Sequence, residues 1–399
     1  MLENSLSARD FQHTPPREAG RRRLAALVGA ALGALFLGAV VGGADQSGSE
    51  GDAAAGVTQQ ERDLEAAREA VDGLTLRQQV GQVTISSFPG TTRPEFMRRR
   101  LRARETAGVI LFGATNGGDA AHWRRLTRSL QQAGHGRALI MVDQEGGDIR
   151  TVEHVGPEAG QPFQGAPADV RRTARSTGRG LANAGVNVNL APVADVARAG
   201  SVMATRSFAG DERGVAARTR AAIRGMREGS GATAGGRGGV AATAKHFPGL
   251  GAATVNTDDG PATVRGPVSR DLVPFRAAIA EGVPLVMLSH AAYPALDANR
   301  IASQSRPIVT GLLRRKLGFD GVIVTDSLEA AAVLARSGVA TAAERSIRAG
   351  ADLILMTGSG SWNVVYPRLL KEARSDPVFR ARVRDAAARV LALKGQLVR

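Results

Sequence analysis

The chain has 399 residues, a formal net charge of +15, a hydrophobic fraction of 43% and no cysteine. The length allows one large domain or two smaller ones with a sizeable core, and the lack of cysteine excludes disulfides, thiolate metal sites and a cysteine nucleophile. The positive charge raises the question of nucleic acid. However, aromatic residues make up only 4% of the chain and no recognition-helix or zinc-finger pattern occurs, so we expect no nucleic-acid partner.

The N-terminal region predicts a membrane segment outside the folded domain. Three consecutive arginines end a basic tail, residues 1–23, and the uncharged run 24–43 follows, with the ~20 apolar residues that a membrane-spanning helix needs. The arginines before this run and Asp45 after it predict a cytoplasmic tail and an exported remainder. A cleaved signal peptide, which would give a secreted protein, is the alternative. We favour a retained signal anchor because the run is long and no clear cleavage site follows. Residues 44–60 predict a flexible linker.

From residue 61 to residue 399 the pattern predicts one domain of alternating strands and helices. An amphipathic helix over 61–74 comes first, and a helix over 380–395 ends the chain. Between them, short apolar runs alternate with helical stretches rich in Arg and Ala, several of which end in Gly as helices often do. The predicted strands are 80–88, 108–113, 138–147, 186–196, 239–249, 284–293, 321–328 and 351–358.

Eight strands that alternate with helices predict an α/β fold, a parallel sheet closed into a single TIM-type (β/α)8 barrel. A doubly wound open sheet is the alternative, and its dinucleotide-binding version is disfavoured because no G-x-G-x-x-G follows the first strand. In a barrel, polar residues at the carboxyl ends of the strands carry the chemistry. Five predicted strands end in such residues, which are Asp143-Gln144-Glu145, Asp195, Lys245-His246, Ser289-His290 and Asp326.

Carboxylates around a barrel mouth, together with Lys, Arg and His, suit the hydrolysis of glycosidic bonds. That reaction needs one carboxylate as nucleophile or base and a second group as acid. A metal hydrolase is disfavoured because neither H-x-H nor H-E-x-x-H occurs. We therefore expect no metal and no cofactor, although Asp143 with Glu145 could hold a divalent cation. A Schiff-base aldolase with Lys245 as nucleophile and His246 as base remains open on residue chemistry alone.

Five motifs, in chain order, resemble those of glycoside hydrolase family 3, most of all its bacterial β-N-acetylhexosaminidases. The motifs are VDQEGG (142–147), NLAPVADV (189–196), TRSFAGD (205–211), KHFPGLG (245–251) and VTDSLEA (324–330). The resemblance runs from about residue 70 to the end of the chain. It implies a catalytic barrel and a retaining, exo-acting glycosidase without metal, which acts on β-linked N-acetylglucosamine in cell-wall or related glycans. The resemblance implies a glycan or amino-sugar substrate as partner, whereas the membrane is expected as a partner through the N-terminal segment.

The resemblance implies a role for each matching residue. Asp326 matches the nucleophile, which forms a covalent glycosyl-enzyme intermediate, whereas the residue alone could equally cap the following helix. Asp143, Arg206, Lys245 and His246 match the side chains that bind the sugar in the −1 site. Without the resemblance, these four could be a turn former, a partner in a surface salt bridge, a snorkelling lysine and a core histidine.

The acid/base group departs from the family pattern. The family's hexosaminidases carry Asp-Ser-His after the KHFPG motif, with the His as general acid/base, whereas the matching positions here are Asn256, Thr257 and Asp258. We predict that Asp258 is the acid/base, with Asp259 as the alternative. The carboxyl of Asp starts from a pKa of ~3.9 and the imidazole of His from ~6.5, so burial or a nearby negative charge must raise the pKa of Asp258. Asn256 could donate a hydrogen bond to it.

A second departure follows VDQEGG. The family carries a sugar-binding Arg there, and the matching position is Thr151 with Arg150 one residue before it. Arg150 could take over that contact after a small shift. The alternative to an active enzyme is a catalytically weak or inactive family member that binds glycans.

Overall fold

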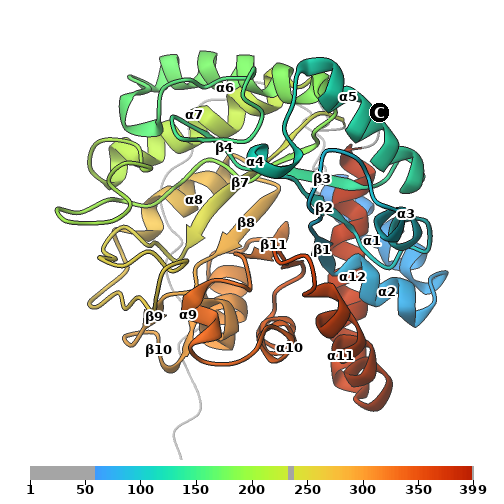
Figure 1. Cartoon of the computed structure of the whole chain (residues 1–399). Coiled ribbons are helices and arrows are strands. Elements are labelled where there is room, and N and C mark those ends of the chain that lie inside the picture. Colours follow the sequence, from blue (N-terminus) through green and yellow to red (C-terminus); the bar gives the residue numbers. More distant parts are fainter. Residues whose placement is uncertain (1–58, 232–237, 398–399) are drawn as a thin grey trace, which may run out of the picture. The chain divides into compact units, whose positions relative to one another are not determined.

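Eight parallel strands form the core of the computed structural model, which describes residues 59–231 and 238–397 (Figure 1). They pair in chain order from β1 to β11, and β12 pairs with β1. A bridge between Val324 and Leu353 joins β11 to the residues just before β12, so the barrel is nearly closed. The predicted barrel is confirmed, and the open doubly wound sheet is wrong. The strands are β1 (Thr84–Ser86), β2 (Gly108–Ile110), β3 (Leu139–Val142), β6 (Val188–Asn189), β7 (Ala241–Phe247), β8 (Leu285–Leu288), β11 (Val322–Thr325) and β12 (Ile354–Leu355).

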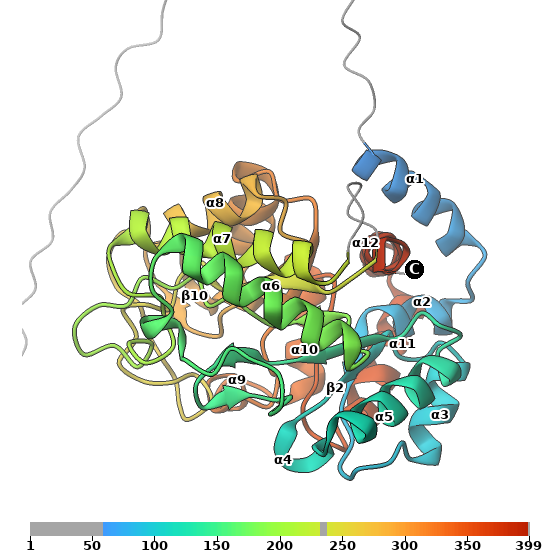
Figure 2. The same ribbon diagram turned by 90° about the horizontal axis from the view of Figure 1, so that it is seen from above.

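Helices cover the outside of the barrel (Figures 1 and 2). The longer ones are α3 (Glu95–Arg102), α5 (Ala120–Ala133), α6 (Pro167–Asn183), α7 (Glu212–Gly229), α8 (Leu272–Ala280), the π-helical segment η3 (Pro307–Lys316), α10 (Val339–Ala349) and α11 (Trp362–Ser375). Short elements in the loops are α4 (Gly113–Asn116), α9 (Ala331–Leu334), η1 (Gln161–Phe163), η2 (Ala302–Gln304), and the hairpins β4 (Gln144–Gly146) with β5 (Ile149–Arg150) and β9 (Ala292–Tyr293) with β10 (Asp297–Ile301).

Three further helices pack at the amino ends of the strands. These are α1 (Gln59–Asp72), α2 (Leu76–Gln82) and the C-terminal α12 (Pro377–Leu397), and both α1 and α2 contact α12. The strands are apolar on both faces, as is usual for a parallel sheet covered by helices. One set of their side chains, including Ile85 and Met141, forms a cluster with Val390 and Leu393 of α12. The last helix therefore packs under the barrel and seals its amino-terminal end.

The observed strands are shorter than the predicted runs, for local reasons. The run 80–88 begins inside α2, because the side chains and backbone of Thr75 and Gln78 form a capping box that starts a helix there. The run 138–147 divides into β3 and the hairpin strand β4. In other runs the strand ends before the polar C-terminal residues, as at Asp195 and Asp326, whereas Lys245 and His246 remain within β7.

The predicted basic tail, residues 1–23, and the predicted membrane segment, residues 24–43, lie outside the described residues. Among the helices in 59–231 and 238–397, none combines the length and the apolar character needed to cross a membrane.

Candidate active site

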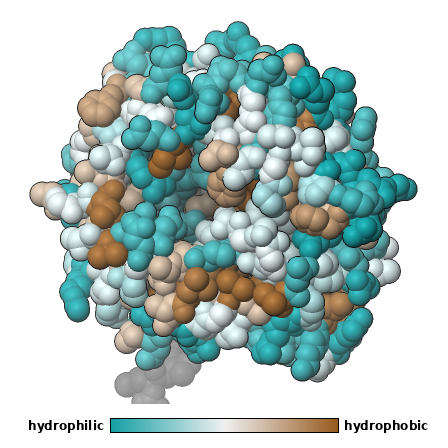
Figure 3. Space-filling view, viewed as in Figure 1, coloured by the Kyte–Doolittle hydropathy of each residue, from teal (hydrophilic) through white to brown (hydrophobic). Residues whose placement is uncertain are grey.

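A cavity of about 610 Å³ lies at the carboxyl ends of the strands. The face drawn in Figure 3 is hollowed near its centre, with hydrophilic side chains around much of the hollow. All six residues predicted as catalytic or sugar-binding line this one cavity, although they are spread over the chain from 143 to 326. They are Asp143, Arg206, Lys245, His246, Asp258 and Asp326, and Glu145, Arg150, Thr151 and Asn256 join them.

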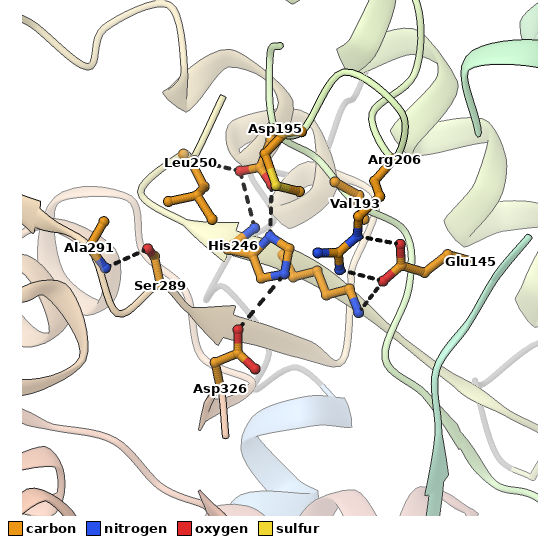
Figure 4. Close-up of polar contacts among 12 residues, drawn as sticks. Glu145, Val193, Asp195, Arg206, His246, Leu250, Ser289, Ala291 and Asp326 are labelled. Atoms are coloured by element: carbon orange, nitrogen blue, oxygen red, sulfur yellow. Dashed lines mark hydrogen bonds and ion pairs between the residues drawn. The ribbon is translucent and has the colours of Figure 1, made fainter. Parts of the chain in front are cut away.

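Glu145 connects two of the predicted sugar-binding residues (Figure 4). Its carboxylate accepts a bidentate pair of hydrogen bonds from Arg206, at 3.0 Å from Nε and 2.7 Å from Nη2. The Nζ of Lys245 lies 2.6 Å from Glu145 Oε1 and 2.6 Å from Asp143 Oδ1. Because the side chains of Glu145 and Lys245 are only 2% and 3% exposed, these are buried ion pairs. Arg206 therefore forms no surface salt bridge and Lys245 does not snorkel to solvent.

The charged cluster of Asp143, Glu145, Arg206 and Lys245 includes two buried groups, Glu145 and Lys245, that are both held in their charged forms. Burial alone would raise the pKa of Glu145, but the charges of Lys245 and Arg206 outweigh it and bring this pKa to about 2. Burial likewise opposes the charged form of Lys245, but the carboxylates of Asp143 and Glu145 raise its pKa above the ordinary 10.5. A lysine nucleophile must lose its proton, so this environment argues against the aldolase. The ion pairs with the same two carboxylates also hold the Lys245 side chain in place.

Within 59–231 and 238–397 no three acidic or His side chains group into a metal site.

His246 is oriented by Asp195, which is fully buried. Asp195 accepts hydrogen bonds from three donors, at 2.8 Å from His246 Nδ1, 3.3 Å from His246 N and 2.6 Å from Leu250 N. With Nδ1 as the donor to Asp195, the other ring nitrogen is directed to the cavity. His246 Nε2 lies 3.9 Å from Asp326 Oδ2 (Figure 4).

Lys245 and His246 are consecutive residues of β7, yet both line the cavity. Successive side chains of a regular strand point to opposite faces. The ladder between β7 and β8 shifts register between Ala244 and Phe247, and such irregularities redirect side chains next to active sites. The irregularity therefore coincides with Lys245 and His246, the two consecutive residues whose side chains both line the cavity.

Asp326 follows β11 directly and faces the cavity with 20% of its side chain exposed. Its Oδ1 accepts a hydrogen bond of 2.8 Å from the N–H of Ser327. Helix α9 begins only at Ala331, so Asp326 does not cap it. Burial opposes the charge of Asp326, but His246, His290, Lys245 and the Ser327 N–H outweigh burial and hold its pKa below the ordinary 3.8. The carboxylate is therefore ionised and free of a capping role.

Asp258 lies at the rim of the same cavity, in a loop that is fixed by backbone hydrogen bonds. The carbonyl groups of Thr257 and Asp258 accept hydrogen bonds from the N–H groups of Ala332, at 3.0 Å, and Ala331, at 3.2 Å. Asn256 does not donate to the Asp258 carboxyl as predicted; its Oδ1 accepts a 3.2 Å hydrogen bond from the Asp258 backbone N–H. Asn256 thus fixes the turn that carries the acid.

The pKa of Asp258 is raised above its ordinary 3.8, first by burial and then by the negative charge of Asp326. Burial and a nearby negative charge are the two effects expected from the sequence to raise the pKa of an aspartic acid that serves as the general acid. Its side chain is exposed at the rim, so water screens both effects and limits the size of the shift. Asp259 does not line the cavity, which makes Asp258 the better candidate.

Three residues of the site were named from their strand-end positions but given no role in binding or hydrolysing a sugar. Glu145 joins Lys245 to Arg206, and Asp195 orients His246. His290 is fully buried; its Nδ1 lies 2.8 Å from Ser303 Oγ, and burial lowers its pKa. The strand-end pattern was the available signal for all three, because buried ionisable groups at the mouth of a barrel need partners.

The fold and site define a glycosidase. Two carboxyl groups with oppositely shifted pKa values share a cavity with charged groups suited to sugar hydroxyls, at the catalytic end of a TIM-type barrel. Residues 75–393 match the family model described as the glycosyl hydrolase family 3 N-terminal domain. The chain belongs to glycoside hydrolase family 3, whose members act on O-glycosyl bonds.

Curated proteins and solved structures agree with this assignment. The chain is 32% identical over 298 residues to a β-hexosaminidase of Xanthomonas oryzae pv. oryzae, a match that covers 71% of this chain and 84% of that protein. It is 31% identical over 344 residues to an uncharacterized secreted glycosyl hydrolase of Arthroderma benhamiae, over 81% of this chain and 94% of that one. The crystal structure of a β-N-acetylhexosaminidase from Beutenbergia cavernae matches with a TM-score of 0.71 and 35% identity, over 81% of this chain and 99% of that chain.

Proposed function

We propose that this protein is a retaining, exo-acting β-N-acetylhexosaminidase that releases β-linked N-acetylglucosamine from cell-wall or related glycans. The observation that carries the proposal is the pair of carboxyl groups on one cavity, with the pKa of Asp326 lowered and that of Asp258 raised. Two neighbouring acids whose pKa values are driven apart supply an ionised nucleophile and a protonated acid at the same pH.

In the proposed first step, a carboxylate oxygen of Asp326 bonds to the anomeric carbon while the glycosidic C–O bond breaks. The proton of Asp258 goes to the leaving oxygen, which departs as an alcohol. In the second step, the Asp258 carboxylate takes a proton from water as the water oxygen attacks the anomeric carbon. The ester bond between the anomeric carbon and Asp326 breaks as the bond to the water oxygen forms, and the sugar leaves with its original anomeric configuration.

The charged cluster would hold the −1 sugar during both steps. Asp143 and His246 both line the cavity, and each is fixed by a hydrogen bond to a buried partner, Lys245 and Asp195 respectively. Preorganised groups of this kind do not have to reorganise when charge develops in the transition state. Lys245 and Arg206 share Glu145 and present the remaining N–H donors toward the hydroxyl groups of the sugar.

Specificity for an N-acetylhexosamine is supported by the names of two relatives, a β-hexosaminidase and a β-N-acetylhexosaminidase. The choice of N-acetylglucosamine is supported by the similar solved structure of a β-N-acetylglucosaminidase from Paenibacillus sp.. Arg150 is the cavity residue that fits the proposed replacement for the family's sugar-binding Arg. It lies on β5, which pairs with β4 beside Glu145, and it lines the cavity together with the more deeply buried Thr151.

The test uses the purified full chain with an aryl β-N-acetylglucosaminide and the matching aryl β-glucoside. We expect turnover of the first substrate in preference to the second, and its loss in Asp326→Asn, because an amide cannot form the glycosyl ester. Turnover that survives Asp326→Asn would overturn the nucleophile assignment. Saturable binding of N-acetylglucosamine without turnover would instead support the second candidate, an inactive glycan-binding member, for which the exposed Asp258 in place of a His is the motivating observation.

We also propose that the barrel acts outside the cytoplasm, anchored through residues 24–43 or released after cleavage. The proposal is supported by the charge pattern around that run and by the relative described as secreted. Intact cells that express the chain should lose it on treatment with external protease, or release it into the medium. Full protection of the chain in intact cells, without release, would contradict export.

A further inference from the structure

A second cavity, of about 260 Å³, lies at the end of the barrel opposite the active site. Its walls include residues that immediately precede β1, β2 and β3, such as Gln82, Thr106 and Arg137, and its floor includes the C-terminal α12, which packs beside α2 (Figure 2). Neither Asp nor Glu is among its lining residues, whereas four basic side chains are: Arg104, His135, Arg137 and Lys394. Nothing in the proposed glycosidase mechanism uses this cavity.

Lys394 is the buried member of this group. Its exposed fraction is 5%, and its Nζ donates a 2.7 Å hydrogen bond to Gln82 Oε1, a neutral oxygen. Across the described parts of the chain, no carboxylate pairs with it. Burial, followed by the charges of Arg137 and Arg104, lowers the pKa of Lys394 to about 7. Lysines are rarely buried without an acidic partner. Lys394 is therefore unusual, because it lacks the negatively charged partner that Asp143 and Glu145 provide for Lys245.

Arg104 and Arg137 supply exposed guanidinium groups around Lys394. Neither side chain forms a hydrogen bond or ion pair with any residue in 59–231 or 238–397. Arg104 and His135 adopt left-handed backbone conformations, with φ of 58° and 54°, and they are the two non-glycine residues that do so in these ranges. Such conformations are uncommon for non-glycine residues and cluster at binding sites. Here they occur in the two turns, after α3 and after α5, that form the rim of the cavity.

We propose that this cavity binds a phosphate-type oxyanion, either free or as the phosphate group of a larger molecule. A buried ammonium and two unpaired guanidinium groups converge on one space without an acid among them, and oxyanions accept short, charge-assisted hydrogen bonds from these donors. Scattered surface arginines would explain the two exposed side chains but not the buried Lys394 beneath them. The cavity has room for a substituent beyond the phosphate group.

The test measures thermal unfolding and anion binding of the purified full chain. Sodium phosphate and glycerol 3-phosphate are compared with sodium chloride at equal ionic strength. At a free anion concentration tenfold above its Kd, we expect both phosphates to raise Tm by about 2 °C relative to chloride. If glycerol 3-phosphate binds as tightly as phosphate, the cavity takes phosphate esters; if only phosphate binds, the site is for the free anion.

Variants separate this cavity from the general positive charge of the chain. The double variant Arg104→Gln/Arg137→Gln and the single variant Lys394→Met should each weaken phosphate binding by at least about tenfold. The matched control Arg124→Gln/Arg128→Gln removes the same charge from exposed positions of α5 outside the cavity and should bind normally. Asp326→Asn should also bind normally, so that loss of glycosidase activity and loss of anion binding remain distinguishable.

Three results would overturn the proposal: equal stabilisation by chloride, no stabilisation by either phosphate, or equal weakening in the matched control. If Lys394→Met does not fold, the double arginine variant decides, because both of its positions are exposed.

Discussion

Replacing Asp258 by Asn tests the least conventional part of the proposed mechanism. The change removes the transferable proton and keeps the side-chain shape. The loop itself should stay in place, because it is held by backbone hydrogen bonds from Ala331 and Ala332 and by the Asn256 side chain bound to the residue 258 N–H. Any loss of activity in Asp258→Asn can therefore be attributed to the missing acid.

The size of the loss should depend on the leaving group. General acid catalysis contributes about 10²–10⁴-fold, which corresponds to about 3–5 kcal/mol of the activation free energy. We expect a loss of this size in kcat/KM for an aryl N-acetylglucosaminide whose phenol is a poor leaving group. With a strongly acidic phenol, which needs little proton donation, the loss should be less than about tenfold. Asp259→Asn, the neighbouring control, should change neither value by more than about twofold.

The pH profile supplies an independent reading of the same variant. Activity requires an ionised Asp326, with its pKa held below 3.8, and a protonated Asp258, with its pKa raised above 3.8. The kcat/KM of the unmodified enzyme should rise as the first group loses its proton and fall as the second does, with limbs that belong to the interacting pair. Asp258→Asn should lose the alkaline limb. Equal losses on both substrates, or an unchanged alkaline limb, would refute Asp258 as the acid.

Three further outcomes follow from residues in or beside the cavity. Glu145→Gln should lower the free energy of unfolding at pH 7 by about 3–5 kcal/mol in urea titrations, because the buried Lys245 and the partly buried Arg206 lose their shared partner. Since the folded pKa of Glu145 is about 2 against an ordinary 4.5, its contribution is complete above pH 4.5 and is lost as the pH falls toward 2. The unmodified protein should therefore lose about 3 kcal/mol over that interval that Glu145→Gln does not lose, and parallel profiles would count against the pairing. Asp195→Asn should reduce kcat/KM by about 10²-fold or more with the fold intact by circular dichroism, because His246 loses its orienting acceptor; full activity would show that His246 needs no such partner. Arg150→Ala should raise KM for the N-acetylglucosaminide by about tenfold with little change in kcat, and an unchanged KM would remove Arg150 from the sugar site.

The architecture and the location of the site were predictable from the sequence because both depend on patterns along the chain. Apolar runs that alternate with helical stretches define a parallel barrel, and a barrel places the polar ends of its strands at one mouth. Asp143, Lys245 and Asp326 therefore converge as predicted, even though 102 residues separate the first two. The proposal that Asp326 is a nucleophile rather than a cap needed the family resemblance.

The pairing within the site was not predictable in the same way. The motif VDQEGG places Glu145 at the mouth, but which cations it contacts depends on distances between strands that the chain pattern does not encode. The orientation of His246 by Asp195 is of the same kind. The hydrogen bond from Asn256 was predicted in the wrong direction, because side-chain chemistry suggested a donor whereas the turn geometry uses its oxygen as an acceptor.

The hydrogen bonds that hold the acid loop have a consequence for how this enzyme can change. Ala331 and Ala332 bind the loop through backbone N–H groups, and they lie five and six residues after Asp326, the proposed nucleophile. The distance between the two proposed catalytic positions is thus set by main-chain contacts that do not involve the side chain at residue 258. That side chain can be exchanged while its position is kept, which offers a direct route to engineering: Asp258→His would place an imidazole at the rim without rebuilding the loop, and would shift the alkaline limb of activity toward neutral pH.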